Sequence, residues 1–112
     1  VKKEGSTVRY SESFKAKGVN VNFVEIIAKN HIKIRTYERG VEDETLSCGT
    51  GVTASSIAYL VNKNKNATEH NVDVEAEGGK LSVSCIGDEK SGFTNLQLIG
   101  PATKVYEGSI EI

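Results

Sequence analysis

Residues 48–61 read CGTGVTASSIAYLV, and this run of small and apolar side chains predicts a helix at the centre of the fold. Thr50 is the expected N-cap, because its hydroxyl can accept a hydrogen bond from a free amide of the first turn. The small and apolar residues fall on two helical faces, Val52, Ser56, Tyr59 and Leu60 on one and Ala54, Ile57, Ala58 and Val61 on the other. A helix with so little polar surface is usually buried, and we expect the polar run 62–66 to end it in solvent.

Stretches that are rich in β-branched residues, or that alternate between apolar and polar residues, lie on both sides of this helix and predict strands. They cover residues 21–27, 31–39, 72–76, 81–85, 93–99 and 104–112. Gly78-Gly79 is a hairpin turn signal, whereas residues 40–45 are acidic, lack periodicity and are expected to form a loop. The pattern predicts a single α+β domain over residues 1–112, in which a curved, mostly antiparallel sheet wraps around one central helix.

The composition is typical of a globular domain, with 38% hydrophobic and 26% charged residues. The 14 basic and 15 acidic residues give a net charge of −1, so no positive field is expected to attract a nucleic acid or an anionic membrane. No apolar run approaches the roughly 20 residues that a membrane-spanning helix needs. The two cysteines, Cys48 and Cys85, lack the spacing of a metal site, which predicts free thiols in a cytoplasmic protein and no bound metal.

Cys48 is the strongest candidate for chemistry, because it directly precedes the predicted helix. Unpaired amides and the positive end of the helix dipole gather at a helix N-terminus and favour a thiolate over a thiol. Gly49 and Gly51 let a ligand approach the backbone, and the same amides can hold a carboxylate. A thiolate beside a bound carboxylate suits abstraction of the proton on the adjacent carbon. Cys85 lies on the apolar face of a predicted strand, so we expect it to pack in the core.

Four segments resemble the diaminopimelate epimerase family, in the same order along the chain. Tyr37-Glu38-Arg39-Gly40, followed by Glu44-Thr45-Leu46-Ser47-Cys48-Gly49-Thr50-Gly51, is similar to the family's second-cysteine motif. The segments NVNFV (20–24), GGKL (78–81) and GPATKVYEG (100–108) are similar to its Asn-Val-X-Phe strand, Gly-Gly-X-Leu hairpin and C-terminal segment. The resemblance covers roughly residues 5–112, and four ordered matches are far more specific than Cys-Gly-Thr-Gly alone.

The resemblance implies two similar α+β halves with the active site between them, and the chain is similar to the C-terminal half. It implies an isomerase that inverts one centre of LL-2,6-diaminopimelate to give the meso form, for lysine and peptidoglycan precursor synthesis. Two cysteines exchange the proton, without pyridoxal phosphate or a metal. The second cysteine belongs to the N-terminal half, which this chain lacks, so we expect the chain to be inactive by itself.

The resemblance also implies a set of site residues. They are Cys48 as an acid/base group, Gly49 and Thr50 for the substrate carboxylate, Arg39 for the distal carboxylate, Glu38 for the distal amino group or the protonation state of the thiol, and Asn20 for the distal end of the substrate.

Other functions stay open. One is a related isomerase, such as a proline racemase or a phenazine-pathway isomerase, although Tyr37-Glu38-Arg39-Gly40 resembles the diaminopimelate group more closely. Another is a non-catalytic anion-binding or assembly module, in which the Cys48 thiol has ordinary reactivity. The expected partners are diaminopimelate and the N-terminal half. An open sheet edge would also favour a homodimer formed by strand pairing.

Overall fold

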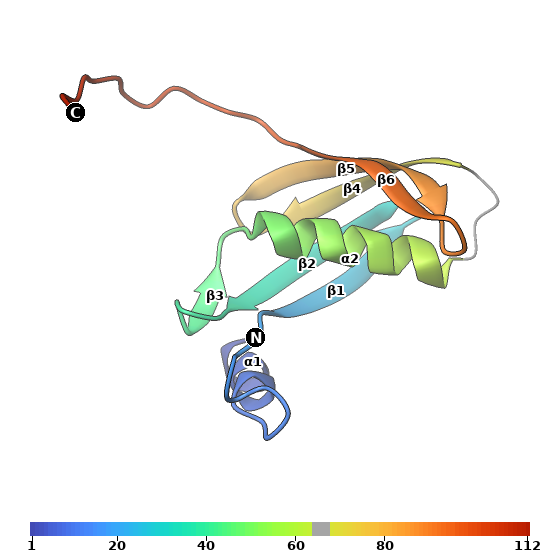
Figure 1. Ribbon diagram of the computed structural model, residues 1–112, viewed down its shortest axis with the longest axis horizontal. Helices are drawn as coiled ribbons and strands as arrows, with labels where there is room; N and C mark the ends of the chain where they lie inside the picture. Colours follow the sequence, from blue (N-terminus) through green and yellow to red (C-terminus); the bar gives the residue numbers. More distant parts are fainter. Residues whose placement is uncertain (64–67) are drawn as a thin grey trace.

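The computed structural model describes residues 1–63 and 68–112 and shows two helices with a mixed six-stranded sheet (Figure 1). In chain order the elements are α1 (Lys2–Arg9), β1 (Val21–Ala28), β2 (His31–Glu38), β3 (Asp43–Thr45), α2 (Gly49–Asn62), β4 (Glu69–Ala76), β5 (Gly79–Asp88) and β6 (Gly92–Ile99). The predicted α+β class is confirmed, as are the central helix and five of the six expected strands. Neither helix has the length and apolar character needed to cross a membrane, within the part of the chain that the structure describes.

The sheet has the strand order β1-β2-β4-β5-β6, and β3 pairs with β2 beside this path. Neighbouring strands are antiparallel except β2 and β4, which pair in parallel through residues 31–33 and 73–75. A parallel pair needs a crossover connection, and α2 lies in that crossover. The sheet is open, because no described strand pairs with the outer edge of β1 or of β6.

The core lies between α2 and one face of the sheet. The alternation predicted for β2 is confirmed, since Ile32 and Ile34 are buried whereas Lys33 and Arg35 are exposed. The buried cluster contains Ile32, Ile34, Val52, Tyr59, Leu60, Val72, Val74, Val83 and Cys85. Burial of this apolar surface is the main force that holds α2 on the sheet. It therefore also fixes the N-terminus of α2 relative to the strand ends.

Helix α2 is buried on one face only. The predicted face of Val52, Ser56, Tyr59 and Leu60 is buried, but Ala54 and Ala58 are exposed. The expectation of a helix buried on nearly every side is therefore wrong for this chain, because the open sheet covers one side. An apolar groove runs between the uncovered side and β6, lined by Gly49, Thr50, Thr53, Ala54, Ile57, Leu96 and Leu98.

Two expectations about irregular segments are wrong. Strand β3 occupies part of the loop expected at residues 40–45, because it pairs with the end of β2. Residues 101–112, which include the strand expected at 104–112, form no strand and leave the sheet as an extended tail (Figure 1). An alternating segment becomes a strand only beside a partner backbone. Residues 64–66 of the polar run lie outside the described residues.

Helix α1 was not predicted from the sequence. Its Gly5 packs directly on the Tyr37 side chain. Tyr37 is consequently only 2% exposed, although it shares a strand face with the exposed Lys33 and Arg35. Helix α1 thus covers a second area of the sheet. This area lies at the end of β2, where the chain continues towards Cys48.

Candidate active site

Cys48 is the N-cap of α2 and has an extended backbone, with φ −132° and ψ 109°. Its carbonyl oxygen accepts the first helical hydrogen bond, from the Val52 N–H at 2.9 Å. The prediction that Thr50 caps the helix is wrong, because α2 begins at Gly49 and Thr50 lies inside its first turn. The predicted place of the thiol, at the helix end where unpaired amides gather, is confirmed.

Two polar side chains contact the Cys48 sulfur. Asn20 Nδ2 lies 3.7 Å from Cys48 Sγ, and Thr50 Oγ1 lies 3.4 Å from the same atom. Asn20 Oδ1 accepts a hydrogen bond of 2.8 Å from the Arg39 N–H, which turns the amide so that its NH₂ group faces the sulfur. The Cys48 sulfur thus lies between an amide N–H group and a hydroxyl.

The β1–β2 hairpin brings Asn20 and Arg39 together. Val21 pairs with Tyr37 in antiparallel register, so the residue before β1 lies beside the residues that follow β2. The Arg39 side chain is held in place by a hydrogen bond of 2.8 Å from Nη1 to the Lys17 carbonyl oxygen. Gly18, at φ +80°, lies against this side chain and leaves no room for a Cβ.

An open hollow of about 350 Å³ lies between these strand ends and the start of α2. Its lining residues are Val19, Asn20, Asn22, Arg39, Thr50, Gly51 and Ala54. A guanidinium, two amides and a hydroxyl beside a helix N-terminus form a set of groups that binds carboxylates well. Asn20, Arg39 and Thr50, all predicted from the sequence, thus share one hollow, and Asn20 and Thr50 join it to the Cys48 sulfur.

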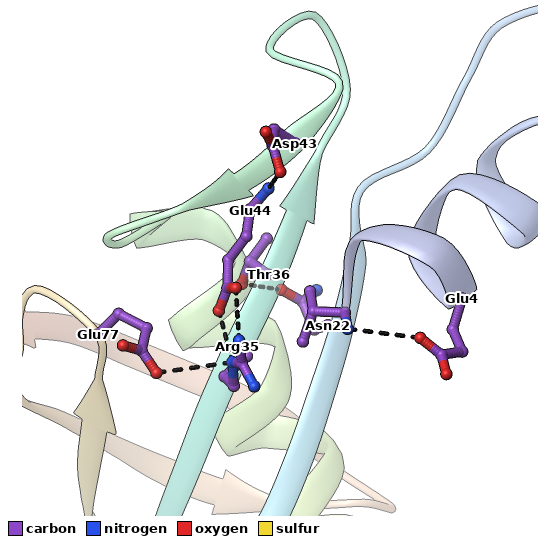
Figure 2. A network of polar contacts seen from close by, with 8 residues as sticks. Glu4, Asn22, Arg35, Thr36, Asp43, Glu44 and Glu77 are labelled. Atoms are coloured by element: carbon purple, nitrogen blue, oxygen red, sulfur yellow. Dashed lines mark hydrogen bonds and ion pairs between the residues drawn. The ribbon is translucent and has the colours of Figure 1, made fainter.

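Charged contacts fix the segment that leads from β2 to Cys48. Arg35 donates from Nε and Nη2 to the two carboxylate oxygens of Glu44, both at 2.6 Å (Figure 2). These hydrogen bonds hold the pKa of the Glu44 carboxyl below its usual value. Glu42 accepts hydrogen bonds from Tyr37 Oη at 2.9 Å and from Arg9 Nε at 3.1 Å, which tie α1 to the same segment.

A family model described as diaminopimelate epimerase matches residues 1–105. The chain belongs to the diaminopimelate epimerase family. The diaminopimelate epimerases of Flavobacterium psychrophilum, a Hydrogenobaculum species and Aquifex aeolicus are 49%, 44% and 44% identical to it. The matches cover 98%, 98% and 96% of this chain, but only 42%, 37% and 37% of the relatives. The chain thus spans about two fifths of the length of these relatives.

Two residues that the family resemblance assigns to the site lie outside the hollow. Gly49 begins α2 but lines the apolar groove, where an added Cβ would lie 3.1 Å from Leu98 Cδ2. The Glu38 side chain neither lines the hollow nor makes a hydrogen bond or ion pair with another described residue. The roles of Gly49 and Glu38 stay predictions.

Asn22 lines the hollow of this family member, although it was not among the site residues predicted from the sequence. Its Oδ1 accepts a hydrogen bond of 2.8 Å from Thr36 Oγ1 (Figure 2). Its side chain also lies so close to Gly51 that a Cβ there would collide with it. The sequence did contain a signal, because residues two apart in an extended segment face the same side and Asn22 follows Asn20 at that spacing.

Cys85 confirms the prediction of a core cysteine. It is 3% exposed and belongs to the apolar cluster beneath α2. Burial raises the pKa of its thiol. Within the described residues, 1–63 and 68–112, no group of three or more His, Cys, Asp or Glu side chains is arranged to hold a metal ion.

Proposed function

We propose that this chain supplies one side of the active site of a cofactor-independent diaminopimelate epimerase. The observation that carries the proposal is the Cys48 sulfur at the start of α2, 3.7 Å from Asn20 Nδ2 and 3.4 Å from Thr50 Oγ1. The adjoining hollow with Arg39 supports carboxylate binding. Family membership supports the reaction, and the share of the relatives' length supports a site that another part of the protein completes.

In the proposed reaction the Cys48 thiolate removes the proton from the α-carbon of one amino-acid centre. The electron pair of the broken C–H bond spreads into the adjacent carboxylate, where the Thr50 hydroxyl and the first amides of α2 stabilise the added charge. A second cysteine, outside this chain, donates its proton to the opposite face and inverts the centre. Each cysteine is the base in one direction of the reaction and the acid in the other.

The distal end of the substrate is the proposed ligand of the hollow. Arg39 pairs with the distal carboxylate, Asn20 donates to the same end, and Glu38 meets the distal amino group. The thiol and the helix N-terminus then act on the reacting centre. Because binding at the distal end fixes the α-carbon relative to the sulfur, it contributes to the rate and not only to affinity.

The test uses the full-length protein with LL-2,6-diaminopimelate in D₂O. We expect meso-diaminopimelate that carries deuterium at the inverted centre, without added pyridoxal phosphate or metal, and no product from the 112-residue chain alone. A full-length protein that neither exchanges the α-proton nor inverts the substrate would contradict the proposal. Inversion of proline instead would favour the related racemase. No inversion, together with ordinary Cys48 reactivity, would favour the anion-binding module.

The enzyme is further proposed to act in the cytoplasm, in lysine and peptidoglycan precursor synthesis, as a homodimer. The open edges of β1 and β6 support strand pairing between copies, since exposed edges readily accept another strand. Light scattering on the full-length protein tests this, and a monomer at high concentration would contradict it.

A further inference from the structure

The hairpin turn between β4 and β5 contacts the segment that immediately precedes Cys48. The Gly78 N–H donates a hydrogen bond of 2.8 Å to the Leu46 carbonyl oxygen. The contact is close, because a Cβ added to Gly78 would lie 3.1 Å from Leu46 Cβ and 3.2 Å from the Leu46 oxygen. The Gly-Gly pair therefore does more than reverse the chain, since Gly78 lets this turn approach Leu46.

A second tie joins the same two segments through side chains. Glu77 Oε1, in the turn, lies 3.5 Å from Arg35 Nε. Arg35 in turn holds Glu44 of β3 with two hydrogen bonds of 2.6 Å. Figure 2 shows the Arg35 side chain between Glu44 and Glu77. The turn is thus connected to Glu44 through the ion pairs of Arg35. It is connected to Leu46 through a backbone hydrogen bond.

These ties reach the short segment just before Cys48, which belongs to neither β3 nor α2. Strand β3 ends at Thr45 and α2 begins at Gly49, so residues 46–48 lie outside both elements. The Leu46 side chain is 72% exposed and cannot fix its backbone by packing. The hydrogen bond from Gly78 joins the Leu46 backbone to the turn between β4 and β5.

We propose that the Glu77–Gly78 turn is a positioning element for Cys48. It sets the backbone two residues before the cysteine and so holds Sγ at contact distance from Asn20 and Thr50. The expected effect of the turn on turnover rests on the proposed epimerase function. Its expected effect on the position of the sulfur does not. An error of a fraction of an ångström in the base alters the approach to the α-carbon, and geometric errors of about 1 Å are known to cost about 100-fold in rate.

Gly78→Ala in the full-length protein is the direct test. The φ of Gly78 is not in the left-handed region, so alanine fits the backbone, but its methyl group pushes Leu46 away by a few tenths of an ångström. We expect kcat for diaminopimelate to fall about fivefold, with KM changed less than about twofold. Alkylation of Cys48 by iodoacetamide at neutral pH, followed by peptide mass spectrometry, is expected to slow about threefold as the sulfur leaves its donors.

Gly79→Ala is the matched control in the same turn. Gly79 has φ +142° and no atom within 4 Å of an added Cβ, so alanine strains the backbone without touching Leu46. We expect a lower melting temperature with kcat and Cys48 alkylation unchanged below it. If Gly78→Ala does not fold, Glu77→Gln, which weakens only the contact with Arg35, is expected to slow alkylation of Cys48 in the same direction.

The positioning role is overturned if the folded Gly78→Ala protein keeps both kcat and the alkylation rate, or if Gly79→Ala lowers them equally. It is also overturned if Gly78→Ala does not fold and Glu77→Gln leaves alkylation unchanged. A protein that turns over no diaminopimelate contradicts the proposed function instead, and the alkylation comparison still decides the role of the turn.

Discussion

Cys48 and Cys85 carry the same thiol, but the fold gives them opposite surroundings. Cys48 is the N-cap of α2, and an amide and a hydroxyl lie within reach of its sulfur. Cys85 lies in β5 among the apolar side chains beneath the same helix. One cysteine thus meets the polar end of α2 and the other meets its apolar face.

The chemistry of a side chain thus depends on whether it lies at the end of a helix or against the helix's apolar face. The apolar face of α2 excludes water from Cys85, which penalises the charged form and raises the pKa of that thiol. The end of the same helix presents unpaired amides beside Cys48, and an amide and a hydroxyl contact its sulfur. We therefore expect chemistry at Cys48 and packing at Cys85.

The largest expected effect comes from deleting each thiol in the full-length protein. Cys48→Ala removes the proposed base, so kcat for diaminopimelate should fall about 1,000-fold. Cys85→Ala should keep kcat within about twofold and instead lower the free energy of unfolding by about 1 kcal/mol, as expected for a small buried side chain. Steady-state kinetics and urea unfolding measure the two quantities. Equal losses of activity would contradict the comparison.

Alkylation kinetics should separate the two thiols in the unaltered protein. We expect iodoacetamide near neutral pH to modify Cys48 about 100-fold faster than Cys85, since one thiol has donors beside it and the other is 3% exposed. Peptide mass spectrometry over time gives both rates in one sample. Unfolding in guanidinium chloride provides the control, because the two alkylation rates should become similar in the unfolded chain.

Asn20→Ala should reduce the advantage of Cys48 without affecting Cys85. The variant removes the amide 3.7 Å from Cys48 Sγ, so alkylation of Cys48 at neutral pH should slow about fivefold. Asn71→Ala is the matched control, since Asn71 is exposed on β4 and does not line the hollow. An unchanged Cys48 rate in Asn20→Ala would mean that the helix end alone activates the thiol.

The environments of both cysteines were predictable because their signals are local. Alternation in the strand of Cys85 predicts a core position. The small residues after Cys48 predict a helix start there, although the N-cap was placed two residues too late. The family resemblance likewise implied Asn20, Arg39 and Thr50, which the structure brings to one hollow.

The parts that were not predictable depend on contacts between distant segments. Helix α1 is placed by the fit of Gly5 on Tyr37, and no periodicity within residues 1–18 reveals that contact. Residues 104–112 alternate like a strand, but strand formation depends on a partner backbone. The role of Gly78 follows from its closeness to Leu46, which a hairpin signal alone does not contain.

Lowering the pH should produce the smallest of these effects, on the free energy of unfolding. The group concerned is Glu44, in the segment that leads to Cys48. Hydrogen bonds from Arg35 hold the pKa of Glu44 below its usual value. A carboxyl whose pKa is lowered by folding stabilises the folded state above its unfolded value, about 4.3, and this contribution is lost as the pH falls through the folded-state value. We therefore expect the full-length protein to be more stable than Glu44→Gln near pH 7, with the difference shrinking as the pH falls below the unfolded-state value. Urea unfolding across this range measures the gap, and a gap independent of pH would show that ionised Glu44 contributes nothing.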